Sequence, residues 1–115
     1  MKPVRIALSR RAGFDLQATS RAINGLPAQS VARPGPWGNP FSIDGVAAET
    51  GLDRAAAQAE AVARHARWIV GELKTDRQPP ALEKIKADLA GKNLACWCAA
   101  GTPCHVETLI RLANS

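Results

Sequence analysis

The chain has 115 residues, a length that fits one domain and leaves no room for a second. Hydrophobic residues make up 46% and charged residues 22%, proportions that exclude a disordered or fibrous chain. The longest apolar runs fall far short of the roughly 20 residues that cross a bilayer. The first residues do not form the apolar core of a signal peptide. We expect a single cytoplasmic domain, residues 1–115, with no membrane partner.

The net charge of +5 is unevenly placed. Residues 1–41 hold six basic residues against Asp15 alone, and residues 42–115 hold nine basic and nine acidic residues. The whole excess therefore lies in the first third of the chain. This asymmetry favours a phosphate-bearing partner, although a solvated basic face that only aids solubility has the same pattern.

The first third predicts short elements joined by loops. Residues 4–8 alternate as in a strand, and residues 18–23 form a helical turn that ends at Asn24-Gly25. Residues 30–33 predict a second short strand that stops at Pro34. The run 34–41 has three prolines and two glycines, which exclude regular structure. Its two aromatic residues indicate an ordered loop packed on the rest of the domain.

The middle of the chain predicts two helices. The clearer one covers 53–74, with Asp53 near its N-terminus. Its expected buried stripe is Ala59, Val62, Ala66, Ile69, Val70 and Leu73, with His65 partly buried at the border. The second helix covers 81–90, ends at Gly91 and buries Leu82, Ile85 and Leu89.

The last segment predicts a buried strand over 93–98, a tight loop over 99–103 and a helix over 104–114. Strands that alternate with helices imply a parallel sheet covered by helices. The predicted fold is a small α/β domain, Rossmann-like, with a mostly parallel sheet of three or four strands.

All three cysteines lie within nine residues, which indicates a local site in a reducing compartment instead of a disulfide framework. Cys96 and Cys98 point to the same face of a strand, because side chains alternate. Cys104 and His105 follow Pro103 at the start of the last helix, where free N–H groups and the helix dipole favour negative charge.

Four interpretations of this segment remain open. Cys96, Cys98, Cys104 and His105 form a possible ligand set for zinc or iron. Alternatively, Cys98 and Cys104 are catalytic or redox thiols with His105 as base. A third possibility is an anion-binding turn built from backbone amides and His105. Finally, the cysteines can be small buried hydrophobic residues with no chemistry.

The helix N-terminus leads to a specific expectation for the three thiols. Cys104, beside His105, should have a lowered pKa and react first with an alkylating agent. Cys98 should react more slowly, and Cys96, in the middle of a strand, only on unfolding.

Several other residues are candidates for binding a phosphate-bearing ligand. Arg10, Arg11 and Arg33 lie in or beside loops that follow predicted strands, so they should lie at the same sheet edge as Cys98 and Cys104 and can bind phosphate through paired hydrogen bonds. Trp37 can stack on a base. The full set of candidates is Ser9, Arg10, Arg11, Arg33, Trp37, Gly38 and Asn39.

Several of these segments resemble a known family. The segments are 8–14, 31–34, 37–41 (Trp-Gly-Asn-Pro-Phe), 91–98 with its Cys-Trp-Cys string, and Pro103-Cys104-His105. Together they resemble Domain of Unknown Function 4326, a family of bacterial and phage proteins. The resemblance implies that these blocks are the family's hallmark positions, and it implies no reaction.

The leading hypothesis is a site for a nucleotide or another phosphate-bearing molecule, formed by the Arg10/Arg11 loop, the 33–41 loop and the 98–105 segment. Such a protein can be an enzyme that acts on a nucleotide or a nucleic-acid component. The first alternative is a non-catalytic module that binds zinc or iron. The second is a nonspecific nucleic-acid-binding protein that uses the basic first third. The sequence names neither a reaction nor an oligomeric state.

Overall fold

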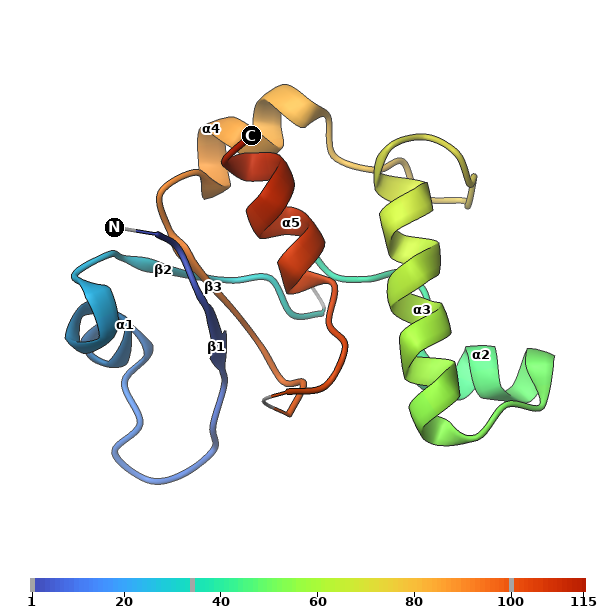
Figure 1. Cartoon of the computed structure of the whole chain (residues 1–115), viewed down its shortest axis with the longest axis horizontal. Helices are drawn as coiled ribbons and strands as arrows, with labels where there is room; N and C mark the ends of the chain where they lie inside the picture. The colour runs from blue at the N-terminus through green and yellow to red at the C-terminus, as the bar shows by residue number, and fades with distance from the viewer. Residues whose placement is uncertain (1, 34, 100) are drawn as a thin grey trace.

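The centre of the computed structural model is a three-stranded parallel sheet with the order β1-β3-β2 (Figure 1). The strands are β1 (Arg5–Ala7), β2 (Ala28–Ser30) and β3 (Asn93–Cys96). The structure describes residues 2–33, 35–99 and 101–115, so Pro34 and Ala100, which belong to predicted loops, lie outside the described residues. The predicted small parallel α/β fold is confirmed.

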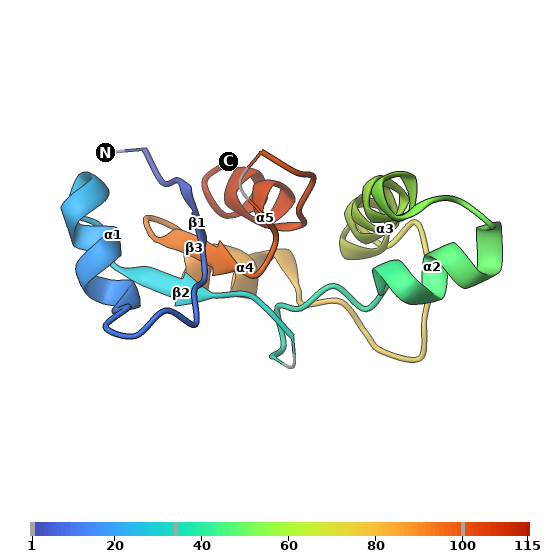
Figure 2. The same ribbon diagram turned by 90° about the horizontal axis from the view of Figure 1, so that it is seen from below.

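The described residues also form five helices: α1 (Leu16–Asn24), α2 (Ile43–Thr50), α3 (Arg54–Ile69), α4 (Leu82–Leu89) and α5 (Val106–Ala113). Helices α4 and α5 pack against each other beside the sheet, whereas α2 and α3 form a pair that projects to one side (Figures 1 and 2). Among the described residues, no helix is long and apolar enough to cross a membrane.

The central strand β3 contributes to a core on each of its faces. Leu94 and Cys96 belong to the larger core, which includes Val106 and Leu109 of α5. Ala95, between them, belongs to a smaller core together with Ile6 and Ala28, against which Leu16 of α1 packs. This alternation is the period of two of a strand buried on both faces. It places the sulfur of Cys96 on the side of α5.

Strand β2 lies two residues earlier than predicted. The observed strand is Ala28–Ser30, and the chain already turns at Ala32, whose carbonyl accepts a hydrogen bond from Gly35 (3.2 Å). The side chain of Gln17 bonds both the N–H and the carbonyl of Ala28, which holds the outer edge of the strand. Pairing with β3 therefore starts before the apolar residue that marks the predicted strand.

Helix α3 differs from its prediction in length and in buried face. It ends at Ile69, because Gly71 takes a left-handed conformation (φ 87°) two residues later. Val70 is 54% exposed and Ala59 is exposed, contrary to the prediction. Ile69 is buried as predicted, and the other buried residues of the helix are Ala57, Ala61, His65 and Trp68. In α4, Leu82 is also exposed, whereas Ile85 and Leu89 are buried as expected.

Helix α2 has no counterpart among the predicted elements. Ser42 caps it by accepting a hydrogen bond from the Gly45 N–H (3.0 Å), and Gly51 ends it in a left-handed conformation. Val46 of α2 packs against Ala57 and Ala61 of α3. The α2–α3 pair forms one wall of the site described next.

Candidate functional site

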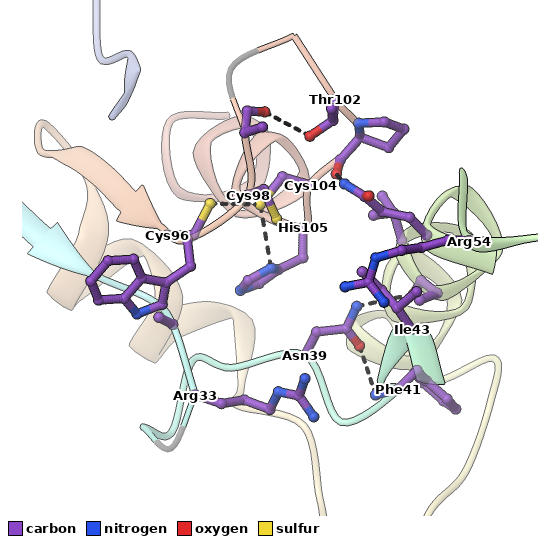
Figure 3. Close-up of a pocket in the computed structure, with 17 residues that line it drawn as sticks. Arg33, Asn39, Phe41, Ile43, Arg54, Cys96, Cys98, Thr102, Cys104 and His105 are labelled. Atoms are coloured by element: carbon purple, nitrogen blue, oxygen red, sulfur yellow. Dashed lines mark hydrogen bonds between the residues drawn. The ribbon is translucent and has the colours of Figure 1, made fainter. Parts of the chain in front are cut away.

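The carboxyl ends of the three parallel strands meet at one edge of the sheet. The segments that follow β2 and β3 line a pocket of about 490 Å³ at this edge (Figure 3). Cys96, Trp97 and Cys98, at the end of β3, line one side of this pocket. Opposite them, the α2–α3 pair contributes Ile43 and Val62. Ligands of parallel α/β proteins usually bind at this end of the strands.

Three sulfur atoms gather at the pocket. The Sγ atoms of Cys96, Cys98 and Cys104 all lie within 4.8 Å of one another, and those of Cys96 and Cys104 are 2.8 Å apart. Cys96 and Cys104 are each 1% exposed, whereas Cys98 is half-buried. The sequence-based expectation that Cys96 and Cys98 face the same side is thus met, although Cys98 lies beyond the last residue of β3.

The loop that returns Cys104 to the cluster is tied to β1. Thr102 donates hydrogen bonds from its N–H (3.1 Å) and its Oγ1 (2.6 Å) to the carbonyl of Ala99. The guanidinium of Arg5 donates to the same carbonyl (2.7 Å) and to that of Thr102, and it pairs with Glu107 at 3.3 Å. Arg5 therefore holds the loop and the first turn of α5 together.

His105 points inward from the start of α5. Its Nε2 lies 2.8 Å from the carbonyl oxygen of Val31, and its Nδ1 lies 3.7 Å from Sγ of Cys104. Burial lowers the pKa of His105, so the ring is neutral near pH 7 and carries one proton. A carbonyl can only accept, so we assign this proton to Nε2. The Nδ1 lone pair consequently faces Cys104. Neither ring nitrogen is then available to donate a hydrogen bond to an anion.

A second histidine packs against the first. His65 is fully buried, and its ring meets that of His105 edge to face with centroids 5.1 Å apart. Neither ring nitrogen of His65 has a hydrogen-bond partner among the described residues. Burial, with smaller contributions from His105 and Arg77, lowers the pKa of His65 to about 3, so this ring is neutral as well. The sequence-based expectation of partial burial underestimates its depth.

The expected order of thiol acidity is wrong. Cys104 precedes α5 by two residues and is buried, so it does not occupy the first helical turn. The pKa of Cys104 is raised, because it hydrogen-bonds to the sulfurs of Cys96 and Cys98 and is shielded from water. The pKa of Cys98 is lowered, because the thiols of Cys104 and Cys96 donate hydrogen bonds to its sulfur and Arg5 adds positive charge. Negative charge in the metal-free cluster therefore resides on Cys98.

Alkylation of the metal-free protein should consequently modify Cys98 first. Cys98 is both the most accessible of the three sulfurs and the one that carries the thiolate. With iodoacetamide near neutral pH, mass spectrometry of peptides should find Cys98 labelled at least about tenfold faster than Cys104. Labelling of Cys104 should require denaturant. Equal labelling rates of the two residues in the native protein would contradict this assignment of charge.

The predicted phosphate-binding residues divide between two places. Arg33 is exposed and lines the pocket. Arg10 lies outside the pocket lining, and its guanidinium stacks 4.5 Å from the centre of the Trp97 ring. Ser9 accepts a hydrogen bond from the N–H of Arg11 (3.0 Å), so its hydroxyl supports the loop. The loops that carry Arg10, Arg33 and Cys98 do follow the strands at one edge of the sheet, because the three strands are parallel.

Trp37 and Asn39 have structural roles in the 33–41 loop. The ring of Trp37 is 7% exposed, belongs to the larger core and lies outside the pocket lining, which corrects the expected stacking on a base. Asn39 does line the pocket. However, its side chain donates to the carbonyl of Ala61 (3.1 Å) and accepts from the N–H of Phe41 (2.8 Å). These bonds fasten the loop to α3.

Gly38 is required by a close approach to Arg33 rather than by a ligand. A Cβ atom at position 38 would lie 2.5 Å from Cγ, 3.1 Å from Cα and 3.2 Å from the backbone nitrogen of Arg33. Gly38→Ala should therefore destabilise the protein by about 1–3 kcal/mol in urea unfolding, because the backbone contacts cannot be relieved by rotating a side chain. Adding Arg33→Ala should recover only part of this loss. A Gly38→Ala protein as stable as wild type would show that the loop can adapt.

Trp97, Arg54 and Gln58 are among the pocket residues that have no counterpart in the predicted site. Trp97 lies between Cys96 and Cys98, and these two neighbours are the feature of the sequence that could have pointed to it. Arg54 starts α3, lines the pocket and pairs with Asp44 at 3.1 Å. Gln58, one turn later, donates to the carbonyl of Pro103 (2.8 Å) and so bridges α3 to the cysteine loop. The last two could be placed at the site only once α3 was positioned against the sheet.

Comparison with known proteins identifies the family. No curated protein and no solved structure matches the chain. The model of the family described as "Domain of unknown function (DUF4326)" matches residues 16–115. This range includes the Trp-Gly-Asn-Pro-Phe string of residues 37–41 and all three cysteines. Since this match covers most of the sequence, the chain belongs to the Domain of Unknown Function 4326 family.

Proposed function

We propose that this protein binds one zinc ion through the thiolates of Cys96, Cys98 and Cys104, with Nδ1 of His105 as the fourth ligand. The observation that carries the proposal is the mutual approach of the three sulfur atoms within 4.8 Å. Three thiolates and one imidazole form a common ligand set of structural zinc sites. Thiolate-rich tetrahedral sites favour zinc, and the usual iron–sulfur clusters take four cysteines, so this donor set supports zinc over iron.

Zinc–sulfur bonds of about 2.3 Å place two sulfurs of a tetrahedral site about 3.8 Å apart. The Cys96 and Cys104 sulfurs, at 2.8 Å, would need to separate by roughly 1 Å, a small adjustment. A nitrogen and a sulfur ligand lie about 3.6 Å apart in such a site. The 3.7 Å between His105 Nδ1 and Cys104 Sγ already matches this spacing.

The hydrogen bond from His105 Nε2 to Val31 supports the role of Nδ1. Zinc-binding histidines usually donate their second ring N–H to a carbonyl or carboxylate, which fixes the tautomer and the ring orientation. Nδ1 does not lie within 4.8 Å of all three sulfurs, so the proposal requires at least one of Cys96 and Cys98 to move toward it as the ion binds.

Elemental analysis of protein purified without a metal-affinity tag tests the proposal. We expect about one zinc per chain and no thiol that reacts until a chelator is added. Cys98→Ser should lose the ion. His105→Gln, which keeps a donor for the Val31 carbonyl, should weaken zinc binding and alter the visible spectrum of the cobalt-substituted protein. Folded, metal-free protein that takes up no added zinc would overturn the proposal.

As a second function, we propose that the pocket beside the zinc site binds a phosphate-bearing ligand, such as a nucleotide. Arg33 and Arg54 both line this pocket, and arginine binds phosphate through two parallel hydrogen bonds. The shift in melting temperature across a panel of nucleotides and phosphorylated sugars measures this binding. We expect a shift that Arg33→Ala abolishes, and no shift with any compound would refute this second function.

A further inference from the structure

Trp97 is the feature of the pocket that neither proposed function uses. Its side chain is 49% exposed, although tryptophan is largely buried in most folded proteins. The other two tryptophans follow that rule, because Trp37 and Trp68 are both in the core. Trp97 also lines the pocket, between two cysteines that direct their sulfurs into the cluster. Trp97 is therefore an exposed aromatic residue at the border of the candidate ligand site.

Arg10 fixes this ring from the neighbouring loop. Its guanidinium lies 4.5 Å from the centre of the indole, a stacking distance that orders both side chains. Arg10 follows β1 and Trp97 follows β3, and these strands are adjacent and parallel, so the contact is built on the rigid edge of the sheet. A flat, ordered aromatic surface with a positive charge beside it suits a flat, electron-rich ligand group.

The charges around Trp97 are unneutralised. In the part of the chain that the structure describes, none of Arg10, Arg11 and Arg33 takes part in an ion pair. By contrast, Arg5 and Arg64 are both paired with glutamates. Arg10, which contacts the exposed indole, and Arg33, which lines the same pocket as Trp97, combine the two features with which proteins bind nucleotides: phosphate neutralisation and base stacking.

We infer that Trp97 stacks on the base of a nucleotide whose phosphate is bound by Arg33. This inference rests on the proposed phosphate site and specifies that its preferred ligand is a nucleotide, which binds more tightly than a phosphorylated sugar without a base. The same chemistry is offered by a free mononucleotide and by one residue of a single-stranded nucleic acid. Stacking on an aromatic side chain strengthens binding by about 5- to 150-fold per base and does not depend on which base is stacked.

Calorimetric titration with adenosine monophosphate and ribose 5-phosphate separates stacking from phosphate binding, because the two compounds differ by the base. Wild-type protein should bind adenosine monophosphate at least about fivefold more tightly. Trp97→Leu should reduce that affinity to the level of ribose 5-phosphate without changing the affinity for the sugar phosphate, and Trp97→Phe should have an intermediate effect. Leu82→Ala, which truncates an exposed apolar side chain of α4, should change neither affinity.

Zinc content, measured for each variant, confirms that the cysteines beside position 97 are intact. A third titration, with an octamer of adenylate, distinguishes the two sources. If the natural ligand is a single-stranded nucleic acid, the octamer should bind markedly more tightly than the mononucleotide. If it is a free nucleotide, the mononucleotide should bind more tightly than the octamer. Equal binding of adenosine monophosphate and ribose 5-phosphate by wild-type protein would overturn the inference and leave the phosphate site standing. Binding of neither compound, nor of the octamer, would overturn both.

Discussion

Removal of zinc should lower the melting temperature of this protein by about 15 °C or more. An ion present at about 1,000 times its dissociation constant stabilises the folded state by about 4 kcal/mol if the unfolded chain does not bind it. For a domain of this size each kcal/mol corresponds to about 4–8 °C. The folded chain preorganises the site, because Arg5 of β1 holds the loop between Cys96 and Cys104 and the carbonyl of Val31 holds His105. Differential scanning calorimetry with and without a chelator measures the effect.

Cys104→Ser provides the internal control for this measurement. The variant lacks one of the three thiolates, so in the presence of zinc it should melt close to the temperature of chelated wild type. Chelation should then have no further effect on it. Restoring zinc, but not magnesium, should return the wild-type protein to its original stability, because thiolates are poor ligands for magnesium. A wild-type melting temperature that is insensitive to chelator would contradict a structural ion.

The part of the site that could be predicted from the sequence is the part set by strand direction. The alternation of β3 and the rule that parallel strands end at one edge are enough to bring Cys96, Cys98 and Arg33 together. The sequence also indicated that Cys104 lies near Cys98, because only the short loop 99–103 separates the two residues. The acidity of Cys104 did not follow, because His105 is the N-terminal cap, so Cys104 lies two residues before the first residue of α5 and is buried.

The buried face of α3 could not be predicted, for a reason of composition. The helix is rich in alanine, which offers almost no hydrophobic contrast between faces. The fully buried face includes His65, a residue that sequence patterns place at the surface or at a border. Helix α2, which packs on that face, was also missed, since its capping signals Ser42 and Gly51 flank only eight residues.

Asn93 explains the unexpected start of β2, and it carries a hydrogen-bond network that sequence patterns do not reveal. It is 0% exposed at the start of the central strand. Its Oδ1 accepts from the N–H of Val4 and from Nδ2 of Asn24, both at 2.9 Å. Its Nδ2 donates to Oγ of Ser20 (2.7 Å) and Oδ1 of Asn24 (2.8 Å). Its backbone N–H donates to the carbonyl of Pro27 (2.9 Å), which sets the register of β2.

Asn93→Leu should therefore destabilise the protein by about 3–5 kcal/mol, since each buried polar group left without a partner costs about 1–3 kcal/mol. This is a large part of the roughly 5–15 kcal/mol that keeps such a domain folded. Urea unfolding at constant zinc should show a lower midpoint with an unchanged slope. The control is Asn114→Leu: the Asn114 side chain makes two hydrogen bonds, with the N–H of Gly91 and the carbonyl of Ile110, but it is exposed and water replaces it. That substitution should cost less than about 1 kcal/mol, because its partners stay hydrated. Equal losses at the two positions would show that burial of the Asn93 network is not what ties α1, β1 and β2 to the central strand.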